Sequence, residues 1–169
     1  MKSVFCIATS RRQSDYIIDC LKYNNFSSRN ISVLFSGEDS WPEFVHERQT
    51  KTQEGKRESE ASVGKGSLGW LAGIRVFAIP ETGFMIASGP LAIMMNELAV
   101  GGAVGGITGG LTGLGIPELE AKRYEENLAN GNILISVCSD NSREVADAEE
   151  IFSKACAEEL YTVEEVANC

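Results

Sequence analysis

The chain lacks most of the residues on which metal and nucleophilic sites depend. It has one histidine, His46, and its five cysteines, at positions 6, 20, 138, 156 and 169, form no C-x-x-C pair. A structural zinc site needs about four clustered ligands, so these spacings predict no metal site. The phosphate-binding motif G-x-x-x-x-G-K-[ST] is also absent. We therefore expect no catalytic residue, no cofactor and no metal, and a protein that is not an enzyme.

Positive charge is scarce as well. The 169 residues include 15 Lys and Arg against 24 Asp and Glu, which gives a net charge of −9. A protein that binds nucleic acid needs clustered Lys and Arg to neutralise phosphates, so the composition argues against a nucleic-acid partner. The N-terminal apolar run is too short for a signal peptide. We expect a cytoplasmic protein in which Cys6, Cys20, Cys138 and Cys156 are small core residues kept reduced.

The two ends of the chain repeat the order strand–helix–strand. Apolar patterning predicts strands and helices over the following ranges: strands 3–9, 30–37, 131–139 and 160–163, and helices 14–26 and 140–159. Ser14 is expected to cap the first helix, and Asp140, Asn141 or Ser142 the second. Two such units predict an α+β, ferredoxin-like βαβ…βαβ fold, in which a four-stranded antiparallel sheet carries two helices on one face.

A long insert separates these two halves of one composite domain. We assign the chain to four parts: 1–37, the first βαβ half; 38–67, a charged connector; 68–116, a glycine-rich helical hairpin; and 117–169, a helix followed by the second βαβ half. The helix is expected over 117–131, with Pro117 at its first position and Gly131 after its end. The hairpin is expected to pair helices over 68–79 and 91–114.

Glycines in the insert recur at helical spacing. Two adjacent series of glycines, each with a spacing of four residues, form a stripe without side chains. The stripe consists of Gly69, Gly73, Gly101, Gly102, Gly105, Gly106, Gly109, Gly110 and Gly113. Each glycine inside a helix costs about 1 kcal/mol relative to alanine, so another backbone must lie close to the stripe to offset that cost. The alternative is an irregular or flexible linker, against which stand the intervening Val, Ile and Leu residues.

The same segment raises the question of a membrane. Residues 98–116 contain no charge over about the length that a bilayer core requires. Eight of these 19 residues are glycine, however, which lowers their hydropathy, and Arg75, Asn96 and Glu97 interrupt the flanking apolar runs. Burial within the chain or against further copies of it is the preferred interpretation, and contact with membrane lipid is the alternative.

Two motifs resemble a known family. They are H-E-x-x-T-K-x-x-E-G, beginning at His46, and G-I-P-E-x-E-A-K-R-Y-E, over 115–125. Together with the glycine-rich segment, they resemble bacterial general-stress or low-temperature-induced proteins that carry a glycine zipper inside a small α+β domain. The resemblance spans nearly the whole chain and implies a stress-linked protein that associates with itself or with a membrane; it implies no catalytic residue. Arg75 and the run 94–98 depart from the family pattern, which weakens the membrane interpretation.

Three hypotheses about function follow. The first is a non-enzymatic module that assembles into a homo-oligomer through the glycine-rich hairpin. The second is a membrane-associated stress protein, and the third a ferredoxin-like sensor of small molecules, which rests on fold analogy alone. The Glu118–Lys122 pair is typical of a solvated helix face, although Lys122 and Arg123 could also meet acidic residues of a neighbouring subunit.

Overall fold

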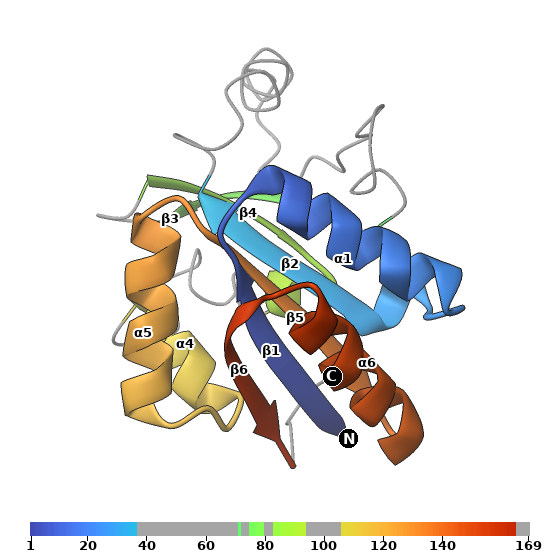
Figure 1. The fold of residues 1–169 in the computed structure, drawn as a ribbon. Helices are drawn as coiled ribbons and strands as arrows, with labels where there is room; N and C mark the ends of the chain where they lie inside the picture. Colours follow the sequence, from blue (N-terminus) through green and yellow to red (C-terminus); the bar gives the residue numbers. More distant parts are fainter. Residues whose placement is uncertain (37–70, 72–74, 80–82, 94–105, 165–169) are drawn as a thin grey trace.

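The computed structural model describes residues 1–36, 71, 75–79, 83–93 and 106–164 (Figure 1). This described part is an α+β fold, as predicted. Its strands are β1 Lys2–Ala8, β2 Ile31–Ser36, β3 Arg75–Ile79, β4 Gly83–Ser88, β5 Ile133–Ser139 and β6 Glu158–Val163. Its helices are α1 Arg11–Tyr23, η1 Ser28–Asn30 (a 3-10 turn), α4 Gly106–Gly113, α5 Glu118–Ala129 and α6 Ser142–Lys154.

The strands form one antiparallel sheet in the order β3-β4-β2-β5-β1-β6. Strands of the two chain ends alternate at its centre, since β5 lies between β1 and β2. The β1–β5 pairing runs from Lys2 opposite Ser139 to Ala8 opposite Ile133. The sheet has six strands where four were predicted, because β3 and β4 of the insert extend it beyond β2.

Helices cover both faces of the sheet, and alternation along the strands supplies a core to each. Figure 1 shows α1 and α6 together on one side, with α4 and α5 on the other. Along β1, Val4 and Cys6 belong to the core under α1 and α6, whereas Phe5 and Ile7 belong to the core under α4 and α5. The prediction of two helices on one face is therefore correct for α1 and α6. It omitted the second face, which the insert helices cover.

The helix predicted over 68–79 is wrong in its described part, because Arg75–Ile79 is β3. The five residues RVFAI include Val, Phe and Ile, which favour strands, and they pair with β4 along its length. The edge of β2 gives β4, and through it β3, a place to form backbone hydrogen bonds. Strand pairing depends on residues that are distant in the sequence. The helical spacing of Gly69 and Gly73, on which the prediction relied, carries no information about such pairing.

The ends of the helices differ from prediction by a few residues. The N-cap of α1 is Ser10, whose side chain accepts a hydrogen bond from the Gln13 N–H, so the assignment to Ser14 is wrong. Asn141 caps α6 in the same way, as one of the three predicted residues. Pro117 is the N-cap of α5 and not its first residue.

The chain turns sharply where β4 ends. Gly89 has φ +63°, and a Cβ atom there would lie 2.4 Å from the carbonyl oxygen of Ile31. Only glycine allows the backbone to come so close to β2 in this left-handed conformation. Side-chain hydroxyls fasten the corner, because Ser88 Oγ accepts from the Val33 N–H and Ser32 Oγ accepts from the Leu91 N–H.

The cysteines do not share one environment. Cys6 is a buried thiol whose pKa is raised by burial, Cys20 is half-buried and Cys156 is exposed in the turn after α6; all three are free. Cys138 is buried in β5 but is disulfide-bonded, so the expectation of a free core thiol is wrong for it. The expectation of a core position is wrong for Cys156. Cys169 lies outside the described residues.

Candidate functional site

The candidate site is a groove between α4 and α5, and its first wall is the glycine-rich helix. Ile107 and Leu111, one turn apart, are buried against the sheet and hold α4 there. The helix ends in a Schellman motif: the Ile116 N–H donates to the Leu111 carbonyl and the Gly115 N–H to the Thr112 carbonyl. Gly115, at φ +101°, supplies the left-handed residue that this ending requires.

A short connection joins α4 to the second wall, α5. Residues 114–117 separate the two helices, which contact each other and thus form a helical hairpin. Ala121, Tyr124 and Leu128 of α5 are buried in the same core as α4. The helical hairpin among the described residues therefore pairs α4 with α5, and not 68–79 with 91–114 as predicted. The expected pairing with 68–79 does not occur at β3.

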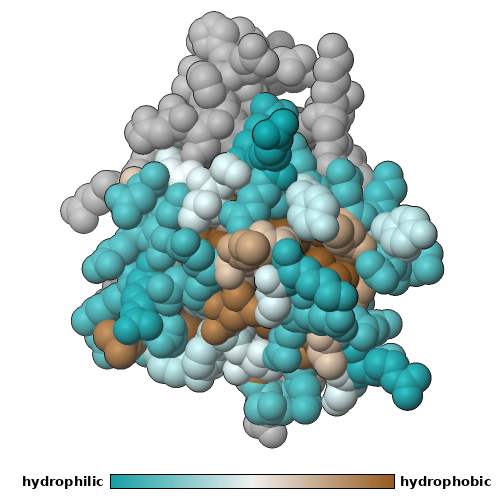
Figure 2. All heavy atoms as spheres, in the orientation of Figure 1, coloured by the Kyte–Doolittle hydropathy of each residue, from teal (hydrophilic) through white to brown (hydrophobic). Residues whose placement is uncertain are grey.

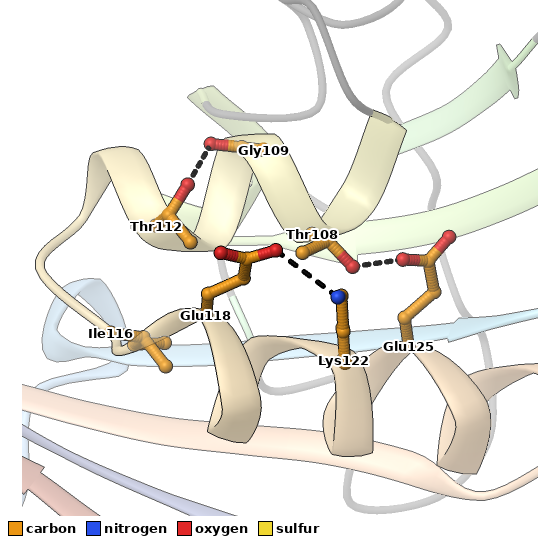
Figure 3. A pocket seen from close by; sticks show the side chains of 7 residues that line it. All are labelled: Thr108, Gly109, Thr112, Ile116, Glu118, Lys122 and Glu125. Carbon is orange, nitrogen blue, oxygen red and sulfur yellow. Dashed lines mark hydrogen bonds and ion pairs between the residues drawn. The ribbon is translucent and has the colours of Figure 1, made fainter.

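The groove between these helices has a volume of about 710 Å³. It is lined by Thr108, Gly109, Thr112, Ile116, Glu118, Lys122 and Glu125. Figure 3 shows the threonines of α4 facing the charged side chains of α5 across it.

Hydrogen bonds and one ion pair order the walls of the groove. The Thr108 hydroxyl donates to a carboxylate oxygen of Glu125 and so links the two helices (Figure 3). The Thr112 hydroxyl donates to the Gly109 carbonyl at 2.9 Å. Lys122 Nζ lies 3.1 Å from Glu118 Oε1, one turn away on α5. The groove is thus polar, with charges of both signs on one wall.

The groove brings together polar groups of three kinds. The groove offers hydroxyls, two carboxylates and one ammonium group, without a cysteine or histidine. Nowhere among the described residues do three His, Cys, Asp or Glu side chains gather as metal ligands would. Tyr124 lies behind the groove, in the core, where burial first and nearby charged groups second raise its pKa. Its hydroxyl donates to the Glu159 carbonyl and is not directed at the groove.

The predicted glycine stripe can be followed only in part. Gly109 lines the groove, and Gly113 is exposed, with no atom from elsewhere in the described ranges within 4 Å of where its Cβ would stand. Gly106 is exposed with φ +64°, and Gly110 is half-buried. The remaining predicted stripe residues, Gly69, Gly73, Gly101, Gly102 and Gly105, lie outside the described residues. So do His46 and the motif that begins there.

Sequence reasoning did not identify Thr108 and Thr112 as wall residues. They are the polar side chains of α4 and lie four residues apart, which was the available signal. It did identify the Glu118–Lys122 pair, but the preferred interpretation was a freely solvated helix face. What places the pair in a groove is the second helix opposite to it, and that arrangement is not a local property of the sequence.

Elsewhere, apolar side chains reach the surface on the face shown in Figure 2, between the helices. Leu160 of β6 is 38% exposed, and Ile151, Ala155 and Ala157 are partly buried against the core. Ile151, Ala155 and Ala157 complete the core beneath α1 and α6, and we do not assign a site to this face.

No helix within the described ranges combines the length and apolar character that crossing a membrane requires. Comparison of the chain with protein-family models, with curated proteins and with solved structures finds no match. The function proposed below therefore depends on the geometry of the groove and on the sequence.

Proposed function

We propose that this protein is a non-enzymatic assembly module that binds further copies of itself through the glycine surface of α4. The observation that carries the proposal is the open space at Gly113, where no other part of the described residues lies within 4 Å of the position a Cβ would take. A connection with stress follows from the family resemblance alone and belongs to the same proposal.

The geometry of α4 separates a core side from a glycine side. With 3.6 residues per turn, Gly109 and Gly113 fall roughly opposite Ile107 and Leu111, the two residues buried in the core. The core of this chain therefore accounts for the apolar side of the helix. It does not account for the absence of a side chain at Gly113.

Helix propensity strengthens this argument. Alanine at an open helical position stabilises a chain by up to about 1 kcal/mol relative to glycine. Among the residues that the structure describes, nothing obstructs that methyl group at Gly113. A second helix backbone that must approach α4 closely gives a physical reason for glycine, as it does in other helix pairs built on small residues.

Molar mass in solution tests the proposal. Light scattering over a concentration series should give multiples of the 18.3 kDa chain for the wild type. Gly113→Leu should shift the distribution towards the monomer, because its side chain holds the second backbone away, while circular dichroism stays unchanged. Gly113→Ala should keep or raise the melting temperature. A wild type that is monomeric at every concentration would overturn the proposal.

A matched control separates the glycine surface from added apolar area. Ala146 is exposed on α6, whose buried face packs on the other side of the sheet. Ala146→Leu adds a similar apolar side chain there and should leave the molar mass of the assembly unchanged. Equal loss of association in Ala146→Leu and Gly113→Leu would count against α4 as the contact.

We further propose that the two chain ends form a ferredoxin-like unit. The support is the strand order β2-β5-β1-β6, antiparallel throughout, with α1 and α6 on one face. In this description β3, β4, α4 and α5 are additions made by the insert. The unit is the scaffold that presents the hairpin of α4 and α5.

A further inference from the structure

The charged wall of the groove carries opposite charges one helical turn apart. Glu118 and Lys122 lie on the same side of α5, with side chains 71% and 60% exposed. Glu125 follows on that side but accepts the hydrogen bond of Thr108. Glu118 and Lys122 are therefore the charged side chains of this wall that remain mostly open to solvent (Figure 3).

We infer that the groove docks onto the same groove of a second copy, with Glu118 of each chain against Lys122 of the other. This inference rests on the proposed self-association through α4 and adds to it a contact between the α5 helices. The two α5 helices would run antiparallel about a two-fold axis that passes between positions 118 and 122. The contact between Glu118 of one chain and Lys122 of the other then occurs twice, as in any interface with two-fold symmetry.

Charge complementarity fits a second copy as the occupant and favours this register. A surface with one negative and one positive group becomes complementary to itself when it is turned by 180° about the midpoint of the pair. A shift that centres the axis on either residue would bring two Lys122 or two Glu118 side chains together. Like charges opposite each other disfavour those registers and so fix the arrangement.

The net charge of the whole chain favours a contact of this kind. Two copies that each carry −9 repel one another at long range. A contact between copies is therefore most favourable where a cation of one chain meets a carboxylate of the other. Gly109, on the opposite wall of the groove, adds no side chain that would hinder the approach.

Charge reversal, alone and in mixture, tests the inference. Glu118→Lys makes both positions 118 and 122 positive, and Lys122→Glu makes both negative, while Glu125 stays hydrogen-bonded to Thr108 in each variant. Each variant alone should associate about tenfold more weakly than the wild type, as measured by analytical ultracentrifugation at low salt. An equimolar mixture of the two should recover association, because each positive wall then meets a negative one.

Glu150 and Lys154 provide a matched control pair. They form an ion pair at the same spacing on α6, with side chains of similar exposure, away from the groove. Glu150→Lys and Lys154→Glu should leave association at the wild-type level. Thermal unfolding of all variants establishes that each remains folded at the temperature of the measurement.

The outcomes separate this inference from the proposed function. A wild type that stays monomeric overturns both. If the wild type associates and the charge variants associate equally well, the docking geometry is wrong and self-association stands. If the single variants dissociate but their mixture does not recover, Glu118 and Lys122 do not meet across the interface, which also overturns the inference.

Discussion

Tyr124 connects three parts of the protein through a single side chain. Its ring lies in the core under α5, 6.2 Å from the ring of Phe5 between centroids. Its hydroxyl donates a hydrogen bond of 2.6 Å to the carbonyl of Glu159, which has a positive φ of 50° in β6. The hydroxyl thus holds an unusual backbone conformation at the edge of the sheet.

We expect the free energy of unfolding to fall at alkaline pH because of Tyr124. Because burial raises its pKa in the folded protein, the neutral phenol contributes fully below the unfolded value of about 10, and the contribution falls as pH rises above that value. The slope attributable to one tyrosine is at most about 1.4 kcal/mol per pH unit. Urea unfolding of the wild type and of Tyr124→Phe at pH 8, 10 and 11 measures it.

At pH 8, Tyr124→Phe should lose about 1–2 kcal/mol, because the carbonyl of Glu159 loses its donor. Above pH 10 the variant should lose stability less steeply than the wild type, so that the two approach each other. Tyr23, 86% exposed, supplies the control: Tyr23→Phe should follow the wild type at each pH. Parallel pH curves for Tyr124→Phe and wild type would contradict this explanation.

At the scale of elements, the start of α1 shows how a cap and a core position differ. Ser10 precedes the helix and accepts from the Gln13 N–H. Ser14, one turn later, is fully buried, and its hydroxyl has no hydrogen-bond partner in the described part of the chain. The two serines therefore have opposite expected effects on stability.

We expect Ser10→Ala to destabilise the protein by about 1 kcal/mol, the usual cost of losing an N-cap. Ser14→Ala should be neutral or stabilising for two reasons. It removes a buried hydroxyl for which the described residues provide no hydrogen-bond partner, and alanine favours the helix more than serine does. Chemical denaturation of both variants decides the point. Destabilisation by Ser14→Ala of the same size as by Ser10→Ala would show that the hydroxyl of Ser14 has a partner after all.

The same scale shows where sequence reasoning succeeds. Strands and helices of the chain ends were predicted within a few residues, because alternation and helical spacing reflect which face each residue buries. The strand β3 was missed because its formation depends on β4 and β2, its neighbours in space. The groove was missed for the same reason, since Thr108 and Glu125 meet only after α4 and α5 dock on the sheet.

At the scale of the whole molecule, the sheet has a protected centre. All seven residues of β5 are buried, and β5 pairs with β1 on one side and β2 on the other. β6, at the end of the strand order, pairs with β1 and has a register shift opposite Phe5 and Ile7. Local opening should therefore cost much more free energy in β5 than in β6.

Hydrogen exchange should reveal this gradient. We expect the amides of β5 to exchange only when the whole protein unfolds, and those of β6 to exchange faster by local opening. Exchange monitored by NMR or mass spectrometry on a dilute sample measures both rates. Equal protection of β6 and β5 would contradict the assignment of β6 as an open edge of the described sheet.

The central place of β5 also has a consequence for synthesis on the ribosome. β2 ends at Ser36 and β5 at Ser139, so 103 residues must be translated before the strand between β1 and β2 exists. At roughly 5–20 residues per second this takes about 5–20 s. Throughout that interval the nascent N-terminal unit carries two hydrogen-bonding edges without their common neighbour. Until β5 emerges, these two edges stay open to pairing with other chains.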